Sequence, residues 1–169
     1  MSEKLEWVRA GDRPELLADP VRRAVREADV AEIDPELADT AAFCERYGVA
    51  LEESANCVIV AAKRGGEVRY AACMVLATMR VDVNGVVRKH LDARKTSFAP
   101  MAEAVELTGM EYGGITPIGL PADWPILVDA NVAALDWAVI GSGLRRSKLA
   151  VSGATLAALP GAEVLALAN

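Results

Sequence analysis

Two apolar runs on either side of a glycine pair constrain the fold of this chain more than any other sequence feature. Residues 56–62 are rich in β-forming side chains, and residues 68–78 form a second apolar run. The Lys-Arg-Gly-Gly-Glu segment between them, residues 63–67, is typical of a tight turn. The two runs are therefore predicted to pair as a β-hairpin.

Short helices and strands are predicted around this hairpin. Helical spacing of apolar residues over residues 14–28 indicates a helix that Pro20 kinks or divides in two. A second helix is predicted over residues 35–47, with Asp34 as its N-cap and Gly48 after its end. Further helices are predicted over residues 82–91, 100–107 and 154–159, and strands over residues 95–98, 125–129, 137–140, 148–151 and 163–167. The mixture, with no repeat or linker, predicts one mixed α/β domain of the α+β class.

Charge is distributed unevenly along the chain. The 169 residues carry 18 Lys and Arg against 24 Asp and Glu, a net charge of −6 that by itself argues against a polyanionic partner. Residues 1–53 hold 7 basic and 14 acidic residues, so the other 116 residues hold 11 and 10. Residues 63–95 hold eight basic and three acidic residues, a net charge of +5. This segment could therefore form a local anion-binding surface.

The cysteine and histidine content excludes several classes of active site. Cys44, Cys57 and Cys73 are odd in number, lack a C-x-x-C spacing and lie in apolar segments, as reduced cysteines of cytoplasmic proteins do. His90 is the only histidine, so a multi-histidine zinc site or a base-assisted nucleophile lacks parts. We expect no metal and no other cofactor. We also expect no membrane span, because the longest uncharged apolar run is residues 71–77.

A segment rich in glycine and proline, residues 109–121, is the first candidate for a binding site. Glycines let the backbone N–H groups of residues 113–119 approach a carbonyl or phosphate oxygen, but they could equally serve only as turn residues. Asp129 also has two interpretations, a carboxylate at a pocket mouth or the N-cap of the segment that follows it. The Gly-Ser-Gly of residues 141–143 is not a dinucleotide motif, because Arg146 stands where a third glycine is needed.

Several of these segments together resemble a known family. They are the hairpin, residues 82–95, the Thr-Gly-Met-Glu-Tyr-Gly-Gly-Ile-Thr-Pro-Ile-Gly run of residues 108–119, the Ile-Leu-Val-Asp of residues 126–129 and the Gly-Ser-Gly of residues 141–143. They are similar to the YbaK/prolyl-tRNA synthetase-associated domain family of trans-editing aminoacyl-tRNA deacylases, over about residues 30–167. The resemblance implies a curved, barrel-like mixed β-sheet surrounded by helices over residues 30–169, with residues 1–29 as an N-terminal helical extension.

The resemblance also implies which residues form the site, in three groups. The catalytic group is Asn56, Gly114, Thr116 and Asp129. The substrate-binding group is Gly113, Ile115, Pro117, Ile118, Gly119, Gly141, Ser142 and Gly143, with Met74 and Leu76 completing the pocket wall. The acceptor stem of tRNA is expected to contact Lys63, Arg69, Arg88 and Lys95. An aminoacyl ester is already activated, so a positioned water and donors for the oxyanion suffice, without a Ser or Cys nucleophile.

One position departs from the family pattern. Members generally carry a lysine near the start of the first hairpin strand, where it holds the phosphate of the terminal adenosine, and Asn56 occupies that place here. Lys63 cannot substitute, because seven extended residues put it roughly 23 Å away.

Three functions are therefore compared. The first is a cytoplasmic trans-editing deacylase for a mischarged small amino acid. Its expected partners are the acceptor end of aminoacyl-tRNA and an aminoacyl-tRNA synthetase, with no DNA or membrane. The second is a non-catalytic module that binds tRNA or an aminoacyl ligand. The third is hydrolysis of a small ester or amide unrelated to tRNA.

Overall fold

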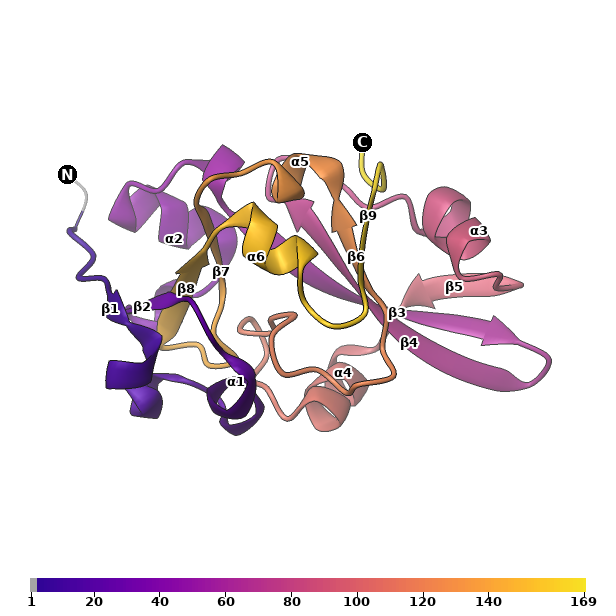
Figure 1. The fold of residues 1–169 in the computed structure, drawn as a ribbon, viewed down its shortest axis with the longest axis horizontal. Helices are drawn as coiled ribbons and strands as arrows, with labels where there is room; N and C mark the ends of the chain where they lie inside the picture. Colours follow the sequence, from indigo (N-terminus) through magenta and orange to yellow (C-terminus); the bar gives the residue numbers. More distant parts are fainter. Residues whose placement is uncertain (1–2) are drawn as a thin grey trace.

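The hairpin predicted from the two apolar runs is the longest feature of the fold (Figure 1). In the computed structural model, which describes residues 3–169, strand β3 spans Ala55–Arg64 and strand β4 spans Glu67–Leu76. The two strands pair antiparallel along their whole length. Gly65 and Gly66 join them with φ angles of 58° and 82°. Glycine adopts this left-handed region without steric cost, and a tight two-residue turn needs it, so the hairpin prediction is confirmed.

Two sheets form the frame of the molecule. The five-stranded sheet has the order β5-β3-β4-β6-β9, with β5 at Lys95–Phe98, β6 at Ile126–Asp129 and β9 at Ala162–Leu165. The four-stranded sheet has the order β1-β2-β8-β7, with β1 at Val8–Arg9, β2 at Asp29–Glu32, β8 at Ser147–Val151 and β7 at Ala138–Gly141. Strands β4, β6 and β9 pair parallel and the other pairs are antiparallel.

The two sheets meet without closing into a barrel. Within residues 3–169, one isolated β-bridge joins the sheets, between Ser54 just before β3 and Val139 in β7. A closed barrel would need a continuous ladder of hydrogen bonds at this junction. The mixed α+β fold in one domain is confirmed, whereas the expected barrel-like closure is not.

Short helices surround the sheets. The α-helices are α1 Asp19–Ala24, α2 Thr40–Tyr47, α3 Arg88–His90, α4 Met101–Thr108, α5 Ala130–Ala133 and α6 Gly153–Ala157. The 3-10 turns are η1 Ala10–Asp12, η2 Pro14–Leu16, η3 Pro35–Leu37 and η4 Leu51–Glu53, and η5 Val83–Val87 is a π-helical turn. None of the helices within residues 3–169 is both long and apolar enough to cross a membrane.

The N-terminal third differs most from the sequence prediction. Its first helix is divided in two, as Pro20 suggested, and the helix predicted over residues 35–47 breaks between η3 and α2. The predicted caps are confirmed: the Asp34 carboxylate accepts a hydrogen bond from the Glu36 amide at 3.0 Å, and Gly48 ends α2 with a φ of 69°. Strand β2 was not predicted. It forms because residues 29–32 pair with β8.

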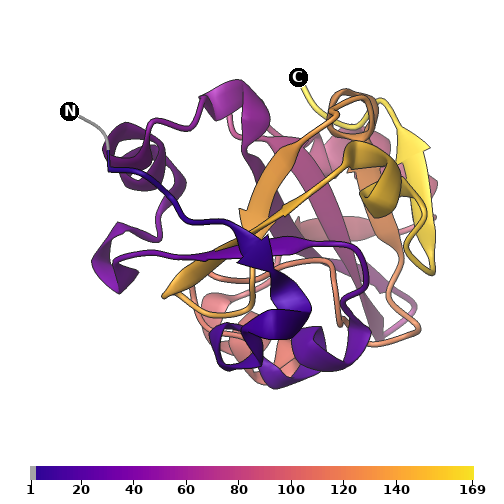
Figure 2. The same ribbon diagram turned by 60° about the vertical axis from the view of Figure 1, so that its left-hand side comes forward.

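One hydrophobic core joins the N-terminal segment to the rest of the chain. Leu16, Leu17 and Val21 are buried in the same cluster as Val128 and Leu149. Strands β1 and β2, in indigo, lie beside β7 and β8 from the end of the chain (Figure 2). The boundary expected at residue 30 therefore falls inside a paired strand.

Candidate active site

A cleft of about 460 Å³ lies where the two sheets meet. Its walls come from the start of β3, the start of α2, the glycine-rich loop, β7 and β8. Of the residues predicted for the site, it brings together Asn56, Gly113, Ile115 and Gly141. The other side chains that shape it include Thr40, Phe43, Cys57, Met101, Tyr112 and Lys148. Residues separated by more than 90 positions thus meet because β3 and β7 are joined at Ser54 and Val139.

Asn56 is fixed at one wall of the cleft. The Thr40 hydroxyl, at the first position of α2, donates a hydrogen bond to Asn56 Oδ1 at 2.7 Å. The amide nitrogen of Asn56 makes no hydrogen bond with any of residues 3–169. A side-chain amide has two donors on this nitrogen. Asn56 therefore offers N–H donors, without a charge, to a ligand in the cleft.

Lys148 supplies a positive charge that the sequence reasoning missed. Its side chain on β8 is buried and its Nζ donates to the carbonyl oxygen of Ala38 at 2.7 Å. The Nζ also lies 5.3 Å from the centre of the Phe43 ring. Loss of water contact is the largest cause that lowers the pKa of Lys148, to about 8. The signal in the sequence was a lysine inside an apolar strand, where alternation places it on a covered face.

The glycine-rich loop contributes only its front edge to the cleft. Gly113 and Ile115 line it, whereas Gly114 packs against the turn after β7. A Cβ on Gly114 would lie 2.8 Å from the backbone of Leu144, and the Gly143 amide donates to the Gly114 carbonyl at 2.6 Å. Gly113 thus fits the interpretation of the glycines as part of a binding site, and Gly114 fits the interpretation of them as structural residues.

The other predicted loop residues lie behind the cleft. The Thr116 hydroxyl is fully buried with no hydrogen-bond partner among residues 3–169. The Ser142 hydroxyl is buried and lies 3.1 Å from the carbonyl oxygens of both Leu144 and Ser147, one of which accepts its single proton. Pro117, Ile118, Gly119 and Gly143 are also absent from the cleft lining, as are Met74 and Leu76. The loop residues among them lie behind the surface of the cleft, and Met74 and Leu76 belong to β4 and its core.

Asp129 caps a helix away from the cleft. It is 1% exposed, and its Oδ2 accepts from the Asn131 amide at 3.1 Å and from Asn131 Nδ2 at 3.0 Å. Its Oδ1 accepts from the amides of Leu167 and Ala168 at 3.0 and 3.2 Å. Both oxygens are therefore engaged by the protein, and the structure does not bring this carboxylate to the ligand space. The N-cap interpretation is the one that the geometry supports.

The cleft contains no activated nucleophile and no metal cluster. Cys57 lines it, but burial raises the pKa of this thiol far above its ordinary value, so it stays protonated. Among residues 3–169, no group of three or more His, Cys, Asp or Glu is placed to hold a metal ion. The chemistry available is therefore hydrogen bonding by amides, hydroxyls, one ammonium group and the exposed carboxylate of Asp39.

Comparison with known proteins identifies the family. The model of the aminoacyl-tRNA editing domain matches residues 34–159, about three quarters of the chain. The chain belongs to the aminoacyl-tRNA editing domain family. A crystal structure of a protein proposed to be a trans-editing enzyme for prolyl-tRNA synthetase is 21% identical with a TM-score of 0.71, covering 83% of this chain and 85% of that one. A structure of a hypothetical protein is 22% identical with a TM-score of 0.74, covering 83% and 90%. No curated protein sequence gives a significant match.

The basic residues of this editing domain divide between two faces of the hairpin. Lys63 and Lys95 are direct cross-strand partners, so they project from one face. Arg69 pairs with Ala62 and projects from the other face, where its guanidinium donates to the Leu91 carbonyl. The Arg88 Nε donates to the Asn84 carbonyl at 2.9 Å. The four predicted tRNA contacts therefore do not form one patch.

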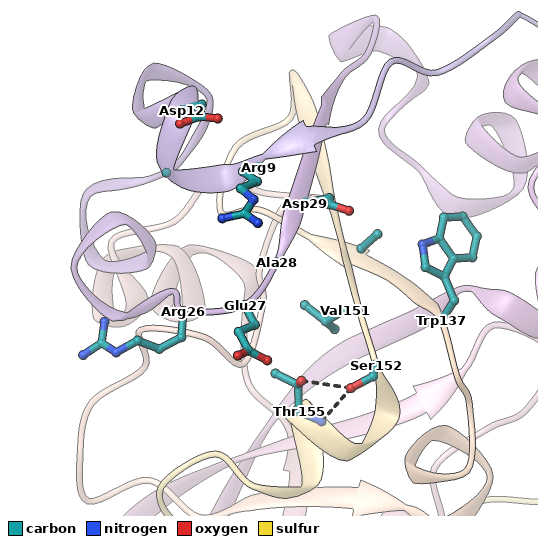
Figure 3. Close-up of a pocket in the computed structure, with 12 residues that line it drawn as sticks. Arg9, Asp12, Arg26, Glu27, Ala28, Asp29, Trp137, Val151, Ser152 and Thr155 are labelled. Carbon is teal, nitrogen blue, oxygen red and sulfur yellow. Dashed lines mark hydrogen bonds between the residues drawn. The ribbon is translucent and has the colours of Figure 1, made fainter.

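A second, larger hollow of about 740 Å³ lies on the four-stranded sheet of the editing domain (Figure 3). Two arginines, three carboxylates and Trp137 surround it, and Ser152 and Thr155 bond each other at 2.9 Å. It contains no residue predicted for the site and no part of the glycine-rich loop. Because it lacks these residues, we place the candidate active site in the smaller cleft.

Proposed function

We propose that this protein is a trans-editing deacylase that hydrolyses the ester between a mischarged small amino acid and tRNA. The observation that carries the proposal is the cleft of an editing domain in which the loop edge at Gly113 and Ile115 faces Asn56 and Lys148. Such a space offers donors to a carbonyl oxygen on one side and apolar surface to a small side chain on the other.

The proposed reaction needs only water as the nucleophile. Water attacks the ester carbonyl carbon, negative charge develops on the carbonyl oxygen, and the bond to the ribose oxygen then breaks. The ribose oxygen takes one proton of the attacking water and leaves as the free hydroxyl of tRNA, and the amino acid leaves as its carboxylate while the second proton passes to solvent. The donors of the cleft would stabilise the developing oxyanion, a contribution typically worth about 10²–10³ in rate.

The test is a panel of tRNAs, each mischarged with one small amino acid. We expect the purified protein to release amino acid from at least one member faster than buffer does. A matched panel of correctly charged tRNAs should be spared. If the protein hydrolyses no tRNA of the panel faster than buffer does, the proposal is contradicted.

A non-catalytic binding module remains the second candidate, because Asn56 provides no charge at its position. The variant Asn56→Lys separates the two functions. If the wild-type protein binds aminoacyl-tRNA without turnover and the variant gains hydrolysis, the protein is a non-catalytic binding module. If the wild type already turns over, the deacylase is correct. If the rate of hydrolysis depends neither on the tRNA body nor on the salt concentration, the protein is instead a small-ester hydrolase.

A further inference from the structure

The cleft holds a buried cation that no carboxylate contacts directly. Lys148 is 7% exposed and its ammonium group, which has three N–H donors, gives one hydrogen bond, to the Ala38 carbonyl. No carboxylate among residues 3–169 lies within 4.0 Å of its Nζ. Burial of an incompletely bonded charge is unfavourable. An anionic ligand in the cleft would remove that penalty.

A purely structural role explains the arrangement less well. The bond to Ala38 does fix the connection between η3 and α2, and the Phe43 ring adds a cation–π contact. A neutral donor could make the same tether without the cost of a buried charge. Lys148 also borders open space rather than closed core.

The groups around Lys148 favour an anion over a cation as the occupant. Asn56 presents amide N–H donors from another wall of the same cleft. The first turn of α2 also borders the cleft, and its N-cap, Asp39, makes no side-chain cap bond. Helix N-termini carry partial positive charge. Asp39 is the one carboxylate on the cleft wall, it is exposed, and Arg145 Nη1 lies 4.0 Å from it.

We infer that Lys148 binds an anionic oxygen of the substrate, either a phosphate oxygen at the 3′ end of tRNA or the ester carbonyl oxygen as it becomes negative. The inference rests on the proposed deacylase function and assigns the charge of its site to β8 instead of to the first hairpin strand. Lys148 and Asn56 then hold the anionic oxygen from two sides.

The first experiment compares Lys148→Met, Lys148→Arg and the remote control Lys4→Met on the mischarged tRNA that the panel identifies. We expect Lys148→Met to lose about 100-fold in kcat/KM, as loss of a charged hydrogen bond at an oxyanion does. Lys148→Arg should retain part of the activity and Lys4→Met all of it. Circular dichroism establishes that each variant is folded. A folded Lys148→Met with wild-type kinetics would overturn the inference.

A shorter substrate distinguishes the two sources of the anionic oxygen. Aminoacyl adenosine carries the ester but no phosphate. If Lys148 binds phosphate, wild type and Lys148→Met hydrolyse it equally, and the defect on tRNA lies mainly in KM. If Lys148 binds the oxyanion, the defect persists on aminoacyl adenosine and lies in kcat.

The pH profile gives a readout that a structural role would not move. Asp39, Cys44 and Arg145 are the titratable and charged groups that act on Lys148. After subtraction of the buffer rate, wild-type activity should have its midpoint of loss near pH 8, where half of this ammonium is deprotonated. Lys148→Arg should keep its activity there, because a guanidinium stays charged. An identical fall in both proteins contradicts the inference.

A binding measurement keeps the inference testable if no tRNA is hydrolysed. The probe is a 3′-aminoacylamino adenosine 5′-phosphate, in which a stable amide replaces the ester. Calorimetry should show binding to wild type that Lys148→Met weakens at least tenfold. If no tRNA of the panel is hydrolysed but Lys148→Met weakens binding of the probe, only the proposed deacylase function is refuted. Equal binding by both proteins refutes a contact of Lys148 with phosphate, because the neutral amide of the probe does not reproduce an oxyanion. No binding by wild type refutes the cleft as the site and the assignment of Lys148 with it.

Discussion

Gly114 is packed against the backbone of Leu144 so closely that a side chain has no room. A Cβ would lie 2.8 Å from backbone atoms, which cannot move aside as a side-chain end can. We expect Gly114→Ala to lower the free energy of unfolding by about 1–3 kcal/mol, as overpacking usually does. Gly11→Ala is the control, because nothing lies within 4 Å of its Cβ, and it should change stability by less than about 0.5 kcal/mol. Urea unfolding measures both, and equal stability of the two variants would contradict the packing argument.

Lys148 should also make stability depend on pH. Its pKa is about 8 in the folded protein, against an ordinary value near 10.4. Between these values the unfolded chain binds more protons at this position than the folded chain, so the free energy of unfolding rises with pH. Relative to Lys148→Met, the wild type should gain about 2 kcal/mol between about pH 7.5 and 9.5. Urea unfolding at both pH values measures this gain. A gain of zero would mean that the folded lysine titrates like an exposed one.

Single residues show where sequence reasoning about the site succeeds and fails. The helix-cap interpretation of Asp129 follows from its place at the end of an apolar strand, and the hydrogen bond from the Asn131 amide supports it. The position of Asn56 in the cleft follows from the hairpin. Lys148 could not be placed, because its neighbours in the cleft, Ala38 and Phe43, are about a hundred residues away in the sequence. Only tertiary structure brings them together.

The hairpin and the neighbouring strand β5 present two lysines that could bind phosphate. The side chains of Lys63 and Lys95 form no hydrogen bond or ion pair with residues 3–169, whereas the guanidiniums of Arg69 and Arg88 already donate to backbone carbonyls. The two lysines are therefore the freer groups for phosphate. We expect Lys63→Ala with Lys95→Ala to reduce the slope of log affinity for tRNA against log salt by about 1.5.

Two matched pairs of substitutions control this experiment. Arg22→Ala with Arg23→Ala removes two charges from α1, far from the hairpin turn in Figure 1, and should leave the slope unchanged. Arg69→Ala with Arg88→Ala should change it less than the lysine pair does. Filter binding over a range of salt concentrations measures all three. Equal slopes for the lysine and α1 pairs would remove the hairpin from the tRNA-binding surface.

Elements with strong local signals were predicted well, and elements defined by distant partners were not. Strands β3 and β4 follow from their two apolar runs and the glycine pair between them. Strand β2 has only two apolar residues between two acidic ones, and it becomes a strand through pairing with β1 and β8. The sheets also could not be predicted to stay open, because closure depends on how β3 and β7 meet.

Charge follows the long axis of the whole molecule. The acidic N-terminal third lies at one end in Figure 1, and the turn of the basic hairpin lies at the other. The net charge of −6 therefore hides an asymmetric distribution. An approaching polyanion would be repelled from the first end and attracted to the second. Under the proposed function, this distribution favours contact of tRNA along the hairpin side.

The N-terminal segment is expected to be required for folding of the whole domain. Removal of residues 1–29 takes Leu16, Leu17 and Val21 out of the main core and leaves β2 without its outer partner. Burial of three such side chains contributes roughly 5–9 kcal/mol, comparable with the total stability of about 5–15 kcal/mol of a typical domain. We expect residues 30–169 alone to show no cooperative thermal transition by circular dichroism, although this piece contains the whole match to the family. A truncated chain that melts within a few degrees of the full chain would show instead that residues 1–29 are a dispensable extension.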